Sequence, residues 1–164
     1  MEKENLKEQD NKTDKNKIRN IKFDKVDKEY EQKLVEVSRV TRVTEGGKRL
    51  RFRACVIVGN KKGKVGVGVA KSGDVALAVD KAFLQAKKNL IDVGFSSYTI
   101  PCEVISKFKA AKILLKPATE GTNIVAGGPV RSLLELAGIQ NVVAKLLGST
   151  KNKITNVYAA MDAL

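Results

Sequence analysis

The residues best suited to chemistry are cations that gather within residues 34–70. They occupy the outer positions and the turns of predicted strands, and they are Arg42, Lys48, Arg49, Arg51, Arg53, Lys61, Lys62 and Lys64. In the cluster formed by the first five of these, arginine outnumbers lysine four to one. Because the planar guanidinium group donates paired hydrogen bonds to phosphate oxygens, the pattern predicts contact with the phosphates of a polyanion.

These cations are positioned by a predicted antiparallel sheet. Apolar residues recur at every second position, which is the period of strands buried on one face: Leu50, Phe52, Ala54, Val56 and Val58, then Val65, Val67 and Val69. A first strand from Glu31 to about Thr44 precedes them. Gly46 and Gly47 supply the first turn, because glycine takes positive φ without steric cost. Residues 60–63 supply the second turn.

Two irregularities interrupt this pattern. The apolar parity of the first strand changes at Val40, so we expect a β-bulge near Ser38. Gly66 and Gly68 alternate with valines and leave one face of the third strand without side chains. Either another backbone packs on that bare face or a ligand approaches it closely.

The apolar periods predict an α+β protein of two small domains. A helix from Gly73 and Asp74 to about Val93 covers the first sheet, with Ser72 or Asp74 as its cap. The expected organisation is a charged extension at 1–30, a first domain at 31–93, a linker at 94–99 and a second domain at 100–164. In the second domain we expect strands at about 101–106 and 112–117 and helices at 130–137 and 156–164, whereas the period alone assigns 141–147 to neither.

Two glycine-rich segments are candidates for phosphate binding. Residues 66–72 end in Lys71 and Ser72, but a P-loop needs glycine directly before the lysine, where this chain has Ala70. The loop that contains Gly121, Gly127 and Gly128 precedes a helix start and is followed by Arg131. It is predicted to be an anion site because backbone amides converge there, or else a tight turn that links a strand to a helix.

Composition narrows the class of function. The formal charge is +13 and the pI about 9.8, which favours nucleic acid or an anionic surface as partner. Residues 1–30 hold 9 basic and 8 acidic groups, so residues 31–164 carry 22 basic and 10 acidic groups, or +12. The chain has no run of about 18 apolar residues and no apolar signal segment, so we expect an intracellular protein that does not enter membranes.

Residue types also argue against an enzyme. Histidine, the commonest general base and metal ligand, is absent. Cys55 and Cys102 stand alone, without the paired spacing of a zinc site, and are expected to be small buried side chains. Aromatic residues make up only 5%, which disfavours a platform that stacks unpaired bases. No catalytic, metal or cofactor site is predicted, and phosphates and shape are the expected basis of recognition.

Two long blocks of the chain resemble the small-subunit ribosomal protein five family of bacteria and their organelles. They are VSRVTRVTEGGKRLRFRACVIVGNKKGKVGVGVAKSGDVALAVDKAFLQAKKN and KPATEGTNIVAGGPVRSLLELAGIQNVVAKLLGST. The resemblance covers about Tyr30 to Leu164 and implies a double-stranded-RNA-binding-like first domain, with a three-stranded antiparallel sheet and a helix. It also implies a second α/β domain of the family's own type, in which residues 141–147 form a strand.

The resemblance further implies a location and partners. Family members bind small-subunit rRNA near the central pseudoknot, contact ribosomal proteins four and eight, and support subunit assembly, decoding accuracy and mRNA entry. The hairpin tip, here Val40 to Arg49, reaches toward the head of the subunit. Ala110 and Lys112 stand where the family often has glycine and arginine at the protein four interface. The expected place is a cytoplasmic or organellar ribosome, and a homo-oligomer is not expected.

Two alternatives remain open from the residues alone. One is a free regulator that binds double-stranded RNA. The other is a small-molecule phosphotransferase, because the fold of the second domain is shared with some kinases, although fold alone does not establish chemistry.

Overall fold

The computed structural model describes residues 29–94 and 99–164. The predicted extension at 1–30 lies almost wholly outside the described residues, as does most of the predicted linker, and the domain boundaries stay predictions. Glu31 to Leu164 form one compact unit. Its elements in chain order are β1 (Glu31–Thr44), β2 (Gly47–Gly59), β3 (Lys64–Ser72), α2 (Val75–Lys88), β4 (Leu90–Asp92), β5 (Val104–Phe108), β6 (Ala111–Pro117), β7 (Ile124–Val125), α3 (Gly128–Ala137), β8 (Val142–Leu146) and α4 (Lys153–Ala163).

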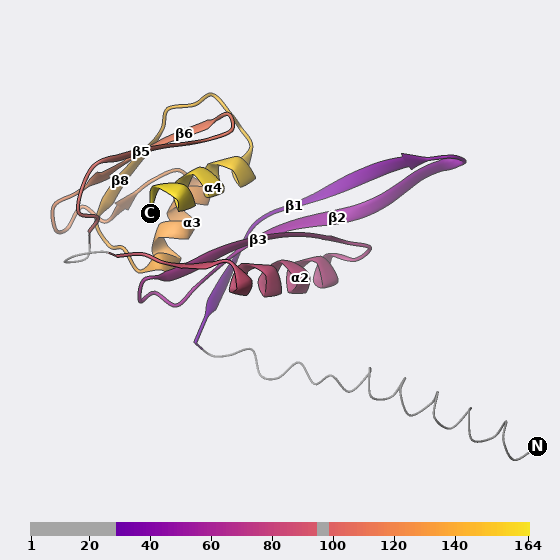
Figure 1. The fold of residues 1–164 in the computed structure, drawn as a ribbon, viewed down its shortest axis with the longest axis horizontal. Coiled ribbons are helices and arrows are strands. Elements are labelled where there is room, and N and C mark those ends of the chain that lie inside the picture. The colour runs from indigo at the N-terminus through magenta and orange to yellow at the C-terminus, as the bar shows by residue number, and fades with distance from the viewer. Residues whose placement is uncertain (1–28, 95–98) are drawn as a thin grey trace, which may run out of the picture. The chain divides into compact units, whose positions relative to one another are not determined.

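The first sheet has the strand order β1-β2-β3-β4, and all its pairs are antiparallel. It confirms the predicted arrangement of three antiparallel strands and a helix. Ser72, the last residue of β3, pairs with Phe52, so no third strand from residues 29–94 or 99–164 lies beside residues 39–51 of the β1–β2 hairpin. That part projects as a two-stranded ribbon (Figure 1).

Two expectations about this sheet were wrong. The helix ends at Lys88 instead of Val93, because Leu90 to Asp92 leave it and pair with the edge of β3 as β4. Leu90 fits the apolar stripe of a helix as well as it fits a strand, so the spacing of apolar residues does not show that the helix ends before it. The bulge lies between Leu34 and Glu36 instead of near Ser38. Beyond Ser38 no core residue of the described chain lies beneath the hairpin, so apolar parity carries no information about register there.

Helix α2 covers one face of the first sheet with small residues. Asp74 is its N-cap, and its carboxylate accepts a hydrogen bond of 2.7 Å from the Val75 N–H. Its buried residues are Ala78, Ala82 and Ala86. A Cβ built on Gly66 or Gly68 would collide with the backbone of this helix. The bare face of β3 is therefore occupied by the protein's own backbone and does not receive a ligand.

The second sheet has the order β5-β6-β8-β7, in which β7 and β8 pair in parallel and the other pairs are antiparallel. Residues 142–146 form the strand that the resemblance implies. Pro129 lies in the first turn of α3, where its missing N–H costs nothing, and Gly138 ends the helix with φ of 93°. The expected last helix begins three residues earlier than predicted, at Lys153.

A single core joins the two sheets. The face of the first sheet opposite α2 packs on α3 and α4, and the second sheet packs on the same helices (Figure 1). Side chains from every one of these layers contribute to the core, among them Cys55, Ile57, Val65, Val67, Ile113, Leu115, Leu133, Leu134, Val142, Val157 and Ala160. The order of layers is therefore α2, first sheet, helix pair, second sheet. Among the described residues no helix packs on the other face of the second sheet.

Candidate nucleic-acid interface

Strand register gathers most of the predicted cations on one face of the hairpin. Arg42 lies directly opposite Arg49, and Val40 lies opposite Arg51. Arg53 pairs with Ser38 on one side and with Lys71 on the other. Since side chains of paired residues share a face, five cations line one side of the ribbon and its base. We call this set the arginine face, and its members are Arg42, Arg49, Arg51, Arg53 and Lys71.

Glu36, which lies opposite Cys55, is a carboxylate on the same side of the sheet as the arginine face, but it forms no ion pair with that face in the described part of the chain. In residues 29–94 and 99–164 none of its cations takes part in an ion pair. Arg53 alone is half-buried, and its Nε donates to Ser38 Oγ at 3.2 Å. Like charges placed directly opposite each other, as in Arg42 and Arg49, destabilise a strand pair. A bound anion between them would remove that cost.

The opposite face of the hairpin differs in character. Lys48 pairs with Val43 there, and Thr41 pairs with Leu50. Val43 is 74% exposed and Leu50 52% exposed. The sequence analysis placed Lys48 with the arginines, whereas the structure puts it on the other side of the ribbon, close to the tip.

Sequence reasoning missed two cations near this site. Arg39 lies opposite Phe52, on the same side of the ribbon as Lys48. Lys71 extends the arginine face beyond Arg53. Counting residues outward from a turn at 60–63 would have paired Gly59 with Lys64 and Arg53 with Ala70, whereas the strands pair Gly59 with Val65 and so align Lys71 with Arg53.

The second cationic turn lies far from the first. Strand β2 runs 13 residues from the hairpin tip to this turn, which is roughly 40 Å at about 3.3 Å per residue. The Asn60 side chain accepts the N–H groups of Lys62 and Lys64 and so fixes the turn. Lys61 N–H donates to the Leu136 carbonyl in α3, at 3.0 Å. The predicted cations therefore form two separate groups.

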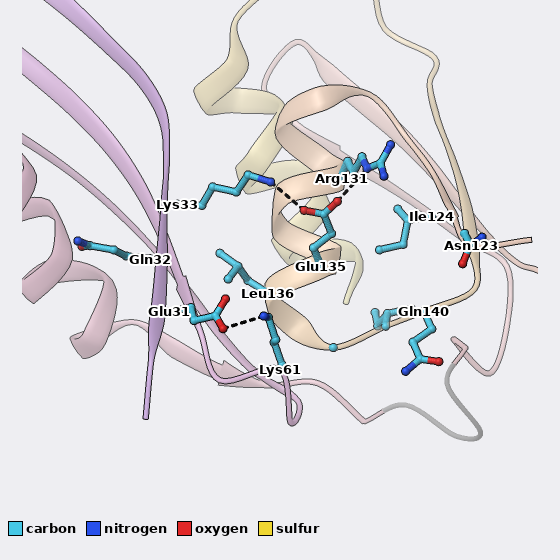
Figure 2. A pocket seen from close by; sticks show the side chains of 12 residues that line it. Glu31, Gln32, Lys33, Lys61, Asn123, Ile124, Arg131, Glu135, Leu136 and Gln140 are labelled. Carbon is cyan, nitrogen blue, oxygen red and sulfur yellow. Dashed lines mark hydrogen bonds and ion pairs between the residues drawn. The ribbon is translucent and has the colours of Figure 1, made fainter. Parts of the chain in front are cut away.

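An open cavity of about 670 Å³ lies beside this second turn, between β1 and α3. Lys61 forms an ion pair of 2.7 Å with Glu31 at its wall. The Glu135 carboxylate forms ion pairs of 2.8 Å with both Lys33 and Arg131. Figure 2 marks the two ion pairs with dashed lines. The hydrogen bonds from Lys33 and then Arg131 hold the pKa of the Glu135 carboxyl below its usual value. Lys61 and Arg131 are thus already paired within the protein.

The predicted glycine-rich anion loop is divided in two. Strand β7 separates Gly121, in a turn with φ of 87°, from Gly127 and Gly128 at the start of α3. Arg131 N–H donates to the Gly127 carbonyl inside the first helical turn. The N–H groups of Thr122 and Asn123 also donate within the protein, to the Thr119 carbonyl and to Asn141 Oδ1. The role of this loop in binding RNA stays a prediction.

The two residues expected at a protein interface lie together on the second sheet. Ala110 is in the turn between β5 and β6, next to Lys109, whose φ is 54°. Lys112 is in β6 and pairs with Lys107 of β5. Both are exposed. Their role in an interface is an expectation that the geometry leaves open.

Chemistry other than binding finds little support in the described part of the chain. No group of three or more His, Cys, Asp or Glu side chains that could hold a metal lies within it. Burial raises the pKa of the Cys55 thiol to about 11, so it stays protonated and unreactive at neutral pH. The expectation of two buried cysteines holds for Cys55 and was wrong for Cys102, which is exposed. None of the described helices has the length and hydropathy to span a membrane.

Comparison with known proteins identifies the family. Residues 30–94 match the model of the ribosomal protein S5 N-terminal domain, and residues 106–164 match that of the ribosomal protein S5 C-terminal domain. The chain is similar to small ribosomal subunit protein uS5 of Thermotoga maritima, with 51% identity over 136 residues, covering 83% of this chain and 76% of that protein.

Two further relatives come from other lineages. Small ribosomal subunit protein uS5 of Thermosynechococcus vestitus is 48% identical over 143 residues, covering 85% of this chain and 82% of that protein. Small ribosomal subunit protein uS5c of Thalassiosira pseudonana is 50% identical over 136 residues, covering 82% and 75% respectively. Two family models and relatives at this identity agree, and the chain belongs to the ribosomal protein S5 family.

Proposed function

We propose that this chain is a structural constituent of the small ribosomal subunit and binds the subunit's rRNA through the arginine face of its hairpin. Family membership supports the general role, since the similar proteins are named small ribosomal subunit proteins. One observation supports the particular surface. Arg42 and Arg49 face each other across a projecting ribbon, and the described residues supply no carboxylate to pair with them.

The ribbon suits recognition of backbone and shape. Guanidinium groups on one face form a row that can follow phosphates, and the glycines at the tip, Gly46 and Gly47, have no Cβ to hold RNA away. Folded RNA presents phosphates and 2′-hydroxyls over a wide, shallow minor groove, where sequence matters little. The proposed contact therefore depends on the fold of the rRNA more than on its bases.

The other predicted RNA contacts differ in whether their cations already form ion pairs with carboxylates of the protein. Lys62 and Lys64 have exposed side chains in the second turn and are proposed as secondary phosphate contacts. Lys61 and Arg131 already have carboxylate partners, so a phosphate must compete for them and gains less. Gly121, Gly127 and Gly128 are proposed as places of close backbone approach.

The finer assignment of neighbours also belongs to this proposal. By its resemblance to the family, the chain would contact ribosomal proteins four and eight and lie near the mRNA entry region. Ala110 and Lys112 are the residues proposed for the protein four contact. The small ribosomal subunit is an asymmetric particle, so we do not expect this chain to form a homo-oligomer there.

Salt dependence of binding tests the arginine face. We would measure the affinity of the full chain for small-subunit rRNA between 50 and 300 mM salt, with an Arg42→Gln/Arg49→Gln/Arg51→Gln variant beside the wild type. Each phosphate contact contributes roughly 0.7–0.9 to the slope of log affinity against log salt, so the slope should fall by about 2 to 3 and the affinity by ten- to a hundredfold.

The control is Lys81→Gln/Lys88→Gln on the exposed side of α2, which removes two charges away from the arginine face, against three in the hairpin variant. It should change the slope by less per removed charge than the hairpin variant does. Equal losses per removed charge in the two variants would show that the general charge binds RNA and would overturn the assignment of the arginine face.

The alternatives give different results in the same assay. A free regulator of double-stranded RNA would bind a generic duplex as tightly as it binds folded rRNA. Membership of a ribosomal protein family argues against a phosphotransferase, and saturable binding of labelled ATP would be needed to bring it back.

A further inference from the structure

Two backbone hydrogen bonds join the second cationic turn, between β2 and β3, to the C-terminal end of α3. The last four carbonyl groups of a helix have no partner within it and must be satisfied elsewhere. In α3 two of these four accept N–H groups of the turn: Lys61 donates to the Leu136 carbonyl at 3.0 Å, and Gly63 donates to the Ala137 carbonyl at 2.9 Å. The turn lies in the N-terminal family domain and α3 in the C-terminal one. One domain therefore completes the end of a helix that belongs to the other.

Two glycines allow the turn to come this close to α3. Gly138 ends the helix with φ of 93°, and a Cβ built on it would collide with the Lys61 carbonyl. A Cβ built on Gly59, the last residue of β2, would collide with the Leu136 carbonyl. Because backbone groups cannot rotate away as a side chain can, a side chain at either position would separate the turn from the helix. We call the Leu136 and Ala137 carbonyls, together with Gly138, the α3 socket.

The conformation of the turn depends on these contacts. Lys61 has φ of 57°, a left-handed conformation that costs free energy in a residue with a side chain and persists where the surroundings enforce it. Asn60 Oδ1 accepts the N–H groups of Lys62 and Lys64, at 2.8 and 3.0 Å, and holds the turn from within. The α3 socket holds it from the other domain. The two sets of bonds together fix the backbone from which both lysine side chains extend.

Charge favours the same arrangement. The C-terminal end of a helix carries a partial negative charge and is stabilised by nearby cations, and the last turn of α3 has no basic residue of its own. Of the lysines that the turn supplies, Lys61 is paired with Glu31. Lys62 and Lys64 form no ion pair with any described residue, although Asp92 lies opposite Lys64 in the sheet. Two cations are therefore held in place and remain available to an anion.

We propose that the α3 socket is a positioning site for RNA binding. The second domain fixes the turn, and the turn presents Lys62 and Lys64 to phosphates at a set distance from the arginine face, at the other end of β2. This inference rests on the proposed function, in which both lysines are secondary phosphate contacts. Two groups of cations held at a fixed distance lose less conformational freedom on binding a folded RNA than two mobile ones. The socket therefore raises rRNA affinity without touching RNA.

A double-mutant cycle in rRNA binding tests the proposal. The affinity of the full chain for small-subunit rRNA is measured for Gly138→Ala, for Lys62→Gln/Lys64→Gln, and for the combination of both. Gly138→Ala and the lysine changes should each lower the affinity about three- to tenfold, because each removes the contribution of two phosphate contacts. The combined loss should stay within about twofold of the larger single loss, because lysines that have left their positions contribute little more.

Three further variants separate positioning from a general loss of structure. The three arginine changes of the hairpin variant should lower the affinity by the same factor in the wild type and in Gly138→Ala, since effects at distant, independent sites add in free energy. Gly73→Ala is the control for the glycine change, because a Cβ there meets nothing within 4 Å, and it should leave the affinity within about twofold of wild type. Asn60→Ala frees the turn without any collision with α3. It should show the same lack of additivity with the lysine changes, and it supplies the cycle if Gly138→Ala does not fold.

The outcomes of the cycle distinguish this inference from the proposed function. If the lysine changes cost the same factor in Gly138→Ala as in the wild type, the socket does not position these lysines and the inference is wrong. It is also wrong if Lys62→Gln/Lys64→Gln leaves the affinity of the wild type unchanged, because there is then no contact to position. Unchanged affinity in the hairpin variant is a different result. It overturns the arginine face of the proposed function, while the cycle at the second turn still decides the role of the socket.

Discussion

The arginine face and the outer face of the second sheet, which lies opposite α3 and α4, have the same local design and different supports. Each contains a pair of like charges directly across two antiparallel strands, Arg42 with Arg49 and Lys107 with Lys112. The hairpin carries its pair on a ribbon, and no other described element packs beneath the outer part of that ribbon. The second sheet carries its pair above α4, where Phe108 and Tyr158 pack with ring centroids 5.3 Å apart.

The packing beneath each face limits the kind of partner that the face can bind. A ribbon exposed on both sides can enter a groove of an irregular anionic surface and adapt to it. A sheet backed by a packed core presents a flat, fixed surface, which suits a second folded protein. The residue types agree with the supports, because arginine forks follow phosphates, whereas lysines beside exposed apolar side chains such as Ile105 suit the protein contact proposed for Lys112.

The largest expected effect is on stability, where truncating a buried side chain of the second sheet is compared with truncating an exposed one of the hairpin. Leu115→Ala beneath the outer face of the second sheet should lower the free energy of unfolding by about 2–5 kcal/mol, because it leaves a cavity in the core. Leu50→Ala in the hairpin should cost less than about 1 kcal/mol, because half of that side chain is in water. Urea denaturation measures both. A large loss from Leu50→Ala would mean that the ribbon has packing partners and would break the contrast.

A smaller effect is expected where the base of the hairpin is held by α2. Gly68→Ala places a methyl group against the Ala82 backbone, so strand and helix must separate slightly, at a cost of about 1–3 kcal/mol. Gly73→Ala is the matched control, since a Cβ there meets nothing within 4 Å. Thermal denaturation should therefore distinguish two substitutions of the same kind five residues apart. Equal melting temperatures would show that α2 does not brace this strand.

The sequence predicted the sheets, the helix pattern and the cationic hairpin because those follow from period and turn chemistry. Residues 50–54 alternate between apolar and basic side chains, and Gly46 and Gly47 have the positive φ that their turn requires. Residues 54–58 are continuously apolar and are buried on both faces of the sheet. The prediction failed where more than one structure satisfies the same period. The local pattern of Leu90 to Asp92 is compatible with a helix, but these residues pair with the edge of β3 and form a strand.

The distribution of the cations could not be predicted from sequence alone. Arg49 and Lys48 are neighbours in the chain and lie on opposite faces of the ribbon, as the pleat of a strand dictates. Lys61 and Arg131 are far apart in the chain, and tertiary packing brings them to one cavity, where carboxylates pair with them. On the outer face of the second sheet only Lys112 was predicted as a contact, from the resemblance, because the residues of this face come from four strands whose order is not fixed by local pattern.

Exchanging arginine and lysine tests whether the guanidinium group itself matters for RNA binding. Arg49→Lys keeps the charge and loses the guanidinium fork, so rRNA affinity should fall about three- to tenfold with little change in salt slope. Lys112→Arg on the second sheet should leave rRNA affinity unchanged. The two variants are compared by filter binding at one salt concentration. Full affinity in Arg49→Lys would show that the hairpin acts as a point charge and that the choice of arginine there has another reason.

The smallest effect is expected at the cavity, where cations are paired within the protein. Lys33 and Arg131 lower the pKa of the Glu135 carboxyl, so its ionised form stabilises the folded state. That stabilisation is present above the ordinary pKa of 4.5 and is lost as the pH falls through the lower pKa of the folded state. Because this carboxylate is largely solvated, Glu135→Gln should cost no more than about 0.5 kcal/mol at pH 7.

The pH dependence decides whether this small loss has the assigned cause. The difference between wild type and Glu135→Gln in urea should shrink toward zero as the pH falls through the lowered pKa of the Glu135 carboxyl, because the wild-type side chain then also becomes uncharged, and it should shrink in high salt as well. A difference that persists in acid would come from packing instead of charge. In that case Arg131 is free to bind RNA on equal terms with Arg49, and the distinction between paired and unpaired cations no longer ranks the proposed contacts.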